Sequence, residues 1–176
     1  MSSTITSPPR TMMEVYQSLP EGTLAELVDN QLYMSPSPLY QHQNLLFEIS
    51  KEISIGISTK GKVLVAPMDV YLDDKRNAVQ PDIIVILKEN MDIIDPKGHI
   101  HGVPDLLVEV LSPGNKEHDL ITKKALYEKF GVKEYWIVDP ETKLFLGFEL
   151  KDAKFQKVHE EIGRFDSGLL GLKFEI

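Results

Sequence analysis

The sequence predicts one α/β domain in which helices flank a central mixed β-sheet. Two nearly unbroken apolar runs, at 82–87 and 105–111, are typical of strands that are covered on both faces at the centre of a sheet. Apolar residues recur at helical spacing over 40–57 and 116–130, so one helix precedes these strands and another follows them. The length of 176 residues is ordinary for one domain.

Shorter elements complete the predicted fold. A helix is expected over 12–19, and Gly131 is expected to end the helix at 116–130 in the position that favours glycine. Asp29-Asn30 predicts a tight turn, because Asn adopts the left-handed conformation at low cost. The remaining predicted strands are 24–28, 31–34, 63–72, 135–138, 144–150 and 155–159.

The composition excludes several classes of protein. Hydrophobic residues make up 42% and charged residues 26%, as in a globular chain. Without cysteine there are no disulfides, thiolate metal sites or cysteine nucleophiles. No apolar run approaches the roughly 18 residues of a membrane span. Residues 1–10 lack the apolar core of a signal peptide, so we expect a flexible tail before a domain at 11–176, in a cytoplasmic protein.

The charge balance limits how this chain can meet nucleic acid. A net charge of −8 and a pI near 5.1 argue against a protein that coats nucleic acid through a basic surface. An enzyme that meets nucleic acid at one basic strip with a bound metal remains possible on these numbers. The candidate strip, which has an ordinary solvated helix face as its alternative, consists of Lys116, Lys123, Lys124, Lys129 and Lys133.

Two carboxylates stand out because of where the predicted strands place them. Glu109 is a lone charge inside an apolar strand, and an ionised carboxylate buried without a partner is very costly. It must therefore be paired, protonated or bound to a metal. Asp82 opens the neighbouring predicted strand, directly after Pro81. The alternative for each is a structural ion pair or a cap on backbone amides.

A lysine on the helix at 116–130 is expected to face these carboxylates. Lys123 shares a helical face with four apolar or aromatic residues: Leu120, Leu126, Tyr127 and Phe130. An inward lysine needs an anion, which Asp82 and Glu109 supply. The alternative is a lysine whose stem is packed while its amine reaches water.

Two carboxylates and a lysine suit metal-assisted cleavage of a phosphodiester. Carboxylates bind Mg²⁺, with Mn²⁺ as a second candidate, because hard cations prefer oxygen ligands. The metal lowers the pKa of a bound water and neutralises charge on the phosphate. The lysine would orient or deprotonate the attacking water and stabilise the transition state.

Several segments together resemble the Uma-type family of putative restriction endonucleases, in the PD-(D/E)XK nuclease superfamily. They are Glu26-Leu27-Val28-Asp29, Ser35-Pro36-Ser37-Pro38 followed by His42-Gln43, Val79-Gln80-Pro81-Asp82-Ile83, the run 104–113, Asp119-Leu120 with Lys123, and Tyr127 followed by 131–140. The resemblance implies a restriction-endonuclease-like fold and covers nearly the whole chain after the tail.

The resemblance also implies roles for individual residues. Asp82 and Glu109 would hold the metal, with the carbonyl of Val110 as a further ligand. The superfamily places its lysine two residues after the second carboxylate, where this chain has Leu111, so Lys123 would take that role from the following helix.

Accessory residues are expected around this site. Glu26 and His42 match family positions that lie near the site. Asp69 lies on a predicted strand that borders it. The other histidines are not expected to form a zinc site, because His99 and His101 share a strand face without a third ligand. His118 and His159 lie among charged residues and are expected at the surface.

The sequence thus predicts a Mg²⁺-dependent endonuclease, with nucleic acid (DNA) as substrate and a homodimer as its assembly. Two alternatives stay open. One is a binding module that retains the fold without catalysis. The other is a metal-dependent phosphoesterase acting on RNA or nucleotides.

Overall fold

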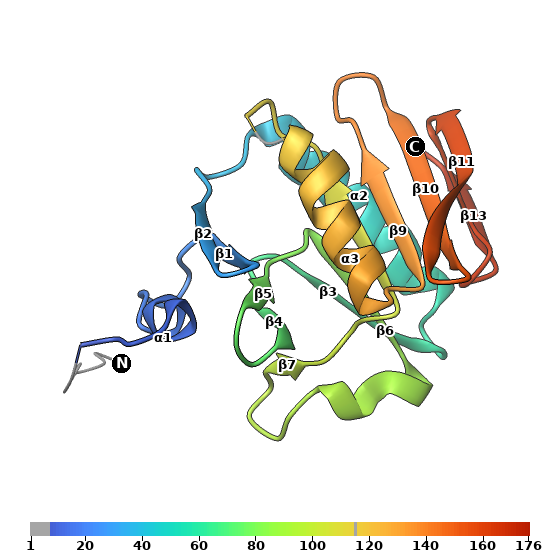
Figure 1. The fold of residues 1–176 in the computed structure, drawn as a ribbon. Helices are drawn as coiled ribbons and strands as arrows, with labels where there is room; N and C mark the ends of the chain where they lie inside the picture. Colours follow the sequence, from blue (N-terminus) through green and yellow to red (C-terminus); the bar gives the residue numbers. More distant parts are fainter. Residues whose placement is uncertain (1–7, 115) are drawn as a thin grey trace.

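A six-stranded mixed sheet forms the centre of the protein, whose computed structural model describes residues 8–114 and 116–176. The strand order is β11-β10-β9-β8-β6-β3 (Figure 1). Of the tail expected at 1–10, residues 1–7 lie outside the described residues. The strands of this sheet are β3 (Gly61–Val65), β6 (Ile83–Leu87), β8 (Leu106–Val110), β9 (Glu134–Val138), β10 (Leu144–Lys151) and β11 (Lys154–Ile162).

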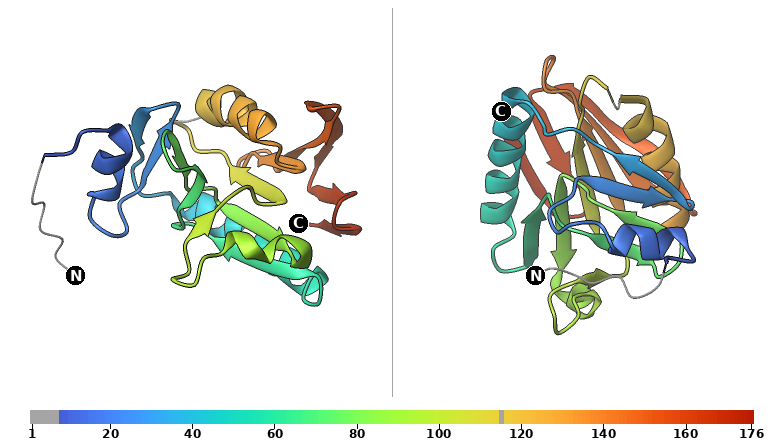
Figure 2. Two further views of the ribbon diagram at one scale, coloured as in Figure 1. Left: turned by 60° about the horizontal axis from the view of Figure 1, so that its bottom comes forward. Right: turned by 90° about the vertical axis from the view of Figure 1, so that its left-hand side faces the viewer.

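Helices cover both faces of this sheet, as the two apolar runs predict. Helix α2 (Tyr40–Gly56) packs its apolar stripe against one face, where Val108 points. The helical run that ends in α3 (Lys124–Phe130) packs against the other face, where Leu107 points. Figure 2 shows α2 and α3 on opposite sides of the strands. Alternate residues of β8 therefore enter two separate cores.

A second sheet lies beside the first and contributes to the site. Its strand order is β2-β1-β5-β4-β7, and α1 (Met12–Gln17) packs against β1. Asp29 and Asn30 join β1 to β2 with positive φ angles of 45° and 70°, as the turn prediction requires. Its strands are β1 (Ala25–Val28), β2 (Gln31–Met34), β4 (Val70–Asp73), β5 (Asn77–Val79) and β7 (Ile100–His101).

The single strand expected over 63–72 is wrong. The chain forms β3 in the large sheet, leaves it, and re-enters the second sheet as β4. Pro67 lies between the two strands, and a proline has no N–H to continue a ladder. The sequence prediction also missed β5, β7, the 3₁₀ helix at Lys88–Ile93 and a terminal hairpin of β12 (Arg164–Ser167) and β13 (Leu172–Glu175), since such short segments show little periodicity.

The helix expected over 116–130 is confirmed, but its first half is not a regular α-helix. His118–Lys123 (η2) is a π-helix that runs directly into α3, and Gly131 ends the run with a φ of 87°. No helix among the described residues is long and apolar enough to cross a membrane.

Candidate active site

The pairing of β6 with β8 brings the two predicted carboxylates together. The strands are antiparallel with Ile83 opposite Val108, so Asp82, one residue before β6, lies beside Glu109 and Val110. The backbone N–H of Val110 donates to Asp82 Oδ2 at 2.7 Å. Glu109 is 2% exposed and points to the same face as Leu107 and Leu111, as the period of a strand predicts.

Lys123 is buried against this carboxylate, so its amine does not reach bulk water. Its Nζ lies 3.0 Å from Glu109 Oε1, and only 5% of the residue is exposed. Two further carboxylates complete its surroundings: Glu26 Oε1 at 2.9 Å and Asp119 Oδ1 at 3.5 Å. The ion pairs of Lys123 within the described chain thus involve Glu109, Glu26 and Asp119, not Asp82.

The π-helix explains why Asp119 joins the site and Leu120 does not. A regular α-helix would place both residues on the face of Lys123, one turn before it. A π-helix closes its hydrogen bonds over a wider turn, which keeps the residue four positions earlier in line and rotates the residue three positions earlier away. Accordingly Asp119 is buried while Leu120 is 36% exposed, so the expected buried face was wrong at Leu120.

Glu26 reaches the site from the second sheet. It lies on β1 with 7% exposed, and its Oε1 accepts the backbone N–H of Gln80 at 2.8 Å. Burial would raise the pKa of Glu26, but the charge of Lys123 and the hydrogen bonds from His118 and Gln80 together lower it to about 2. Glu26 is therefore the carboxylate that stays ionised beside Lys123.

The pKa values of Glu109, Lys123 and Tyr127, which are also buried, are all raised. Burial raises the pKa of Glu109 well above its usual range, helped by Asp119 and Asp82 and opposed by Lys123. Burial would lower the pKa of Lys123, but Glu109 and Glu26 raise it well above its usual range, so it is an ammonium. Tyr127 donates its O–H to Glu109 Oε1 at 2.9 Å, and burial raises the pKa of that phenol.

Two histidines border the carboxylates. His42 of α2 places Nε2 3.2 Å from Asp82 Oδ2; burial would lower the pKa of His42, but Asp82 raises it overall. His118 was expected at the surface, which is wrong: its side chain is 15% exposed and its Nε2 lies 3.6 Å from Glu26 Oε2. Its ring also packs on Tyr33 at 4.4 Å between centroids. The signal for His118 in the sequence was its position directly before Asp119.

Asp69 is connected to this cluster through Gln80. Its Oδ1 accepts the hydroxyl of Tyr16 at 2.7 Å and the side-chain amide of Gln80 at 2.8 Å. Gln80 in turn donates its backbone N–H to Glu26. Asp69 is not among the described residues that line the pocket, so it holds the loop behind Glu26.

A pocket of about 770 Å³ opens over the cluster. Glu26, Asp82, Glu109 and Lys123 form its floor with His42 and His118, and the segment 35–39 and residues 111–114 form its walls. Such a cavity has room for part of a polymeric substrate rather than for a water alone.

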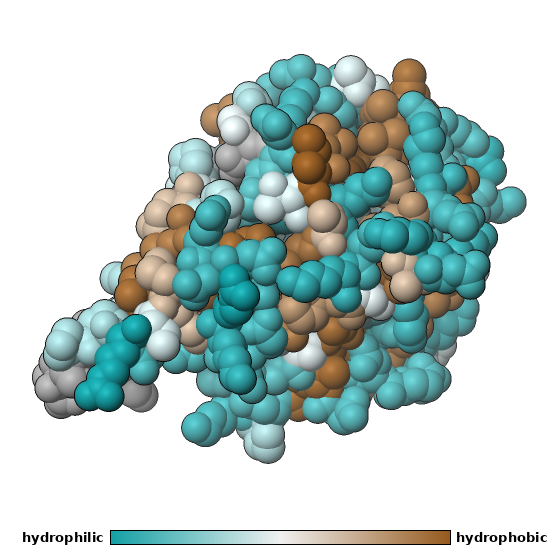
Figure 3. Space-filling view, in the orientation of Figure 1, coloured by the Kyte–Doolittle hydropathy of each residue, from teal (hydrophilic) through white to brown (hydrophobic). Residues whose placement is uncertain are grey.

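The lysines of the candidate strip are mostly neutralised by acidic partners. Lys116 lies 2.9 Å from Asp139 Oδ2, and Lys133 lies 2.6 Å from Asp105 Oδ1. Lys129 pairs with an aspartate as well, and Lys124 lies 4.3 Å from the ring centre of Phe148. The face that carries α3 mixes hydrophilic with hydrophobic residues (Figure 3). The helix is thus not a continuous basic surface.

The carboxylates suit a hard divalent cation. Within the described chain, both contacts to Asp82 fall on Oδ2 and both contacts to Glu109 fall on Oε1, which leaves one oxygen of each for a ligand. The carboxylates of this pocket do not form a group of three ligand atoms that all lie within 4.8 Å of one another; among the described residues only Asp95, His99 and His101, outside the pocket, do so. The pocket therefore offers a metal two carboxylates rather than a closed cage of protein ligands. Mg²⁺ is commonly bound in this way, because it retains several waters.

This sheet, with a helix on each face and paired carboxylates on adjacent central strands, is a restriction-endonuclease-like fold. The chain belongs to the Uma2 family, described as "putative restriction endonuclease", whose model matches residues 13–172. This confirms the family that the sequence segments indicated.

A solved structure supports the same fold. It is a putative nuclease belonging to DUF820 from Anabaena variabilis ATCC 29413, which matches with a TM-score of 0.69 and 19% identity, over 85% of this chain and 84% of that one. No match was found among curated proteins.

Proposed function

We propose that this protein is a divalent-metal-dependent endonuclease that hydrolyses phosphodiester bonds, with DNA as the substrate class. The observation that carries the proposal is the convergence of Asp82 and Glu109 from adjacent strands with the buried ammonium of Lys123. Membership in a family of putative restriction endonucleases supports the same chemistry.

Asp82 and Glu109 would hold Mg²⁺ or Mn²⁺, with the carbonyl of Val110 as a further ligand. The bound metal would lower the pKa of a water and neutralise charge on the scissile phosphate. The protein holds each carboxylate for this task from one side: Val110 and His42 at Asp82, and Lys123 and Tyr127 at Glu109.

Lys123 would orient the attacking water and stabilise the charge that develops on the phosphate. An ammonium has three N–H donors, and Lys123 has three carboxylate neighbours. Glu26 and Asp119 hold it in place beside Glu109 and keep it charged. We assign these two residues to positioning Lys123 rather than to contact with the substrate.

The paired lysines bear on how DNA would be held. Since the strip on the helical run is largely neutralised, attraction to phosphate would come from Lys123 and the bound cation inside the pocket. We further propose a homodimer, because two sites are needed to cut two strands. Two alternatives are an inactive binding module and a phosphoesterase that acts on RNA or nucleotides. The following experiment distinguishes both from a DNA endonuclease.

The test is nicking of supercoiled plasmid in Mg²⁺, Mn²⁺ or EDTA. We compare the wild type with Asp82→Asn, Glu109→Gln and Lys123→Ala, and use Lys173→Ala, an exposed lysine on β13, as the control. We expect metal-dependent nicking that EDTA abolishes, that each site variant reduces by about 10²-fold or more, and that Lys173→Ala leaves unchanged.

Three other results would overturn the proposal. Nicking that persists in Asp82→Asn would place the chemistry elsewhere. A wild type that binds Mg²⁺ but cleaves RNA or a nucleotide ester, and no plasmid, would favour the other phosphoesterase. If no metal supported any cleavage, the binding module would be favoured.

A further inference from the structure

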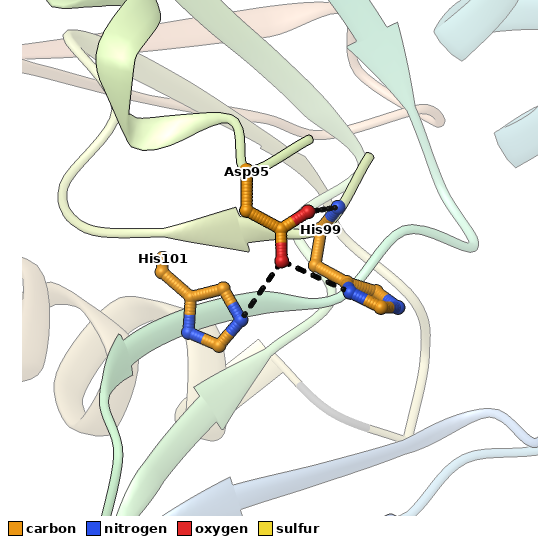
Figure 4. Close-up of side chains that lie close together, drawn as sticks. All are labelled: Asp95, His99 and His101. Atoms are coloured by element: carbon orange, nitrogen blue, oxygen red, sulfur yellow. Dashed lines mark hydrogen bonds and ion pairs between the residues drawn. The ribbon is translucent and has the colours of Figure 1, made fainter. Parts of the chain in front are cut away.

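A second group of metal-ligating side chains lies at the outer edge of the second sheet. Asp95 Oδ2 lies 3.3 Å from His99 Nδ1 and 3.9 Å from His101 Nε2, and the three ligand atoms all lie within 4.8 Å of one another. Figure 4 shows the carboxylate of Asp95 between the two imidazole rings. The expectation that His99 and His101 have no third ligand nearby is therefore wrong.

Backbone hydrogen bonds hold Asp95 in the orientation that a metal would need. Its Oδ1 accepts the N–H of Lys97 at 2.8 Å and that of His99 at 2.9 Å. The turn is closed by the N–H of Gly98 to the carbonyl of Asp95, and Gly98 has a φ of 92° that favours glycine. Oδ1 thus forms the turn, while Oδ2 faces both histidines.

His101 is oriented from its other side. Its ring stacks on Tyr71 of β4 at 4.8 Å between centroids, with the rings 10° apart. Its Nδ1 lies 3.2 Å from Asp74 Oδ1, so an Nδ1–H donated to that carboxylate leaves a lone pair on Nε2 toward Asp95. A carboxylate behind a histidine ligand is the arrangement that fixes its tautomer at zinc sites.

We propose that Asp95, His99 and His101 bind a divalent transition-metal ion of the Zn²⁺ class, through Asp95 Oδ2, His99 Nδ1 and His101 Nε2. Two imidazoles and one carboxylate suit Zn²⁺ better than Mg²⁺, which prefers oxygen ligands. Ligands at about 2.0–2.1 Å from a tetrahedral Zn²⁺ lie about 3.4 Å apart. The 3.3 Å separation already fits this spacing, and the 3.9 Å one fits after a small shift of His101.

The site is separate from the nuclease pocket and open to solvent. The side chains of His99 and His101 are 56% and 42% exposed, so an ion can reach them and a water can take the fourth position. The pocket lining, as far as the chain is described, includes none of the three ligands. A bound ion would tie the turn at 95–99 to β7, a strand of only two residues at the sheet edge.

The first test is titration of the wild type with Zn²⁺, followed by ¹⁵N-edited NMR of the five histidine rings. We expect one equivalent to shift His99 Nδ1 and His101 Nε2. His42 and His118, which border the candidate active site, and His159 serve as internal controls. Shifts at His42 or His118 in place of His99 and His101, or no shift at all, would overturn the proposal.

Calorimetry on variants then assigns the ligands. We expect Asp74→Ala to weaken Zn²⁺ binding about 10-fold, since it removes the carboxylate behind a ligand, and His99→Ala or His101→Ala to weaken it more. The matched control is His159→Gln, which should bind as the wild type does. Affinity within twofold of the wild type in His99→Ala would contradict the proposal, whatever the outcome of the plasmid assay.

Discussion

Lys123 Nζ lies 3.0 Å from Glu109 Oε1, with both groups almost fully buried between α3 and the central sheet. The ammonium taken out of water in this way is held by the carboxyl groups that surround it. Glu26 supplies the second close contact of Lys123, from a different sheet. At the candidate active site Lys123 thus forms ion pairs with one residue of each sheet, Glu26 and Glu109.

Removal of this lysine should destabilise the metal-free protein. We expect Lys123→Met to lower the free energy of unfolding by on the order of 3 kcal/mol, because the ionised, buried Glu26 loses its cation and Glu109 loses a hydrogen-bond donor. Urea unfolding followed by the fluorescence of Trp136, the only tryptophan, measures this. Lys173→Met on exposed β13 should change it by less than about 0.5 kcal/mol. A loss below about 1 kcal/mol in Lys123→Met would show that the ion pairs are not strongly coupled to folding.

The π-helix predicts an unusual order of two neighbouring substitutions. Asp119→Ala should cost about 1–3 kcal/mol, because it removes a buried acceptor of Lys123. Leu120→Ala should cost less than about 1 kcal/mol, because its side chain is partly in solvent. Urea unfolding of the two variants gives the comparison. In a regular α-helix both side chains would face Glu109, so Leu120→Ala would then cost at least about 2 kcal/mol, as much as Asp119→Ala.

His42 should act on metal affinity rather than on the chemical step. It lies 3.2 Å from Asp82 Oδ2, so we assign it to positioning a proposed metal ligand. We expect His42→Ala to raise the Mg²⁺ concentration for half-maximal nicking about 10–100-fold, with the rate at saturating Mg²⁺ nearly unchanged. Lys51→Ala, exposed on the same helix, is the control. A fall in the saturated rate without a change in Mg²⁺ dependence would give His42 a catalytic role instead.

Asp73 gives a prediction for acid stability away from the site. Burial would raise its pKa, but hydrogen bonds from Asn77, Arg76 and Lys75 lower it below its usual value. The folded pKa therefore lies below the unfolded one of about 3.9, so the stabilisation is present above pH 4 and is lost as the pH falls through the folded pKa. The difference in urea midpoint between the wild type and Asp73→Asn should shrink from pH 6 to pH 2. A difference that is constant with pH would contradict this.

Much of the central sheet could be predicted because its signals are local. The run 106–111 is apolar at all positions except Glu109, as expected for a strand that is covered on both faces. The helical spacing around Lys123 likewise required an anion on the sheet side. Both expectations depend on the periods of strand and helix, which hold whatever surrounds them.

Periodicity alone could not place Glu26, Asp119 and His118 around Lys123, although the family resemblance put Glu26 near the site. Glu26 lies almost a hundred residues earlier on a strand of another sheet, and no periodicity relates it to Lys123. The π-helix that keeps Asp119 in the site and turns Leu120 out of it has a hydrogen-bond pattern with no strong residue signature. At the second site the third ligand was local, since Asp95 lies in the same turn as His99, and a turn-forming Asp before Gly98 was the signal available.

The sequence by itself therefore determined the elements and the charges that must be neutralised: a buried Glu109, an Asp82 on the next strand and an inward Lys123. The tertiary structure alone decided which partners neutralise them, because burial brings together groups from separate sheets. The tertiary structure also decided the split of 63–72 into β3 and β4, because the apolar pattern continues along the chain while the two strands join different sheets. Local periodicity specifies which face of an element is buried, and only packing specifies what that face meets.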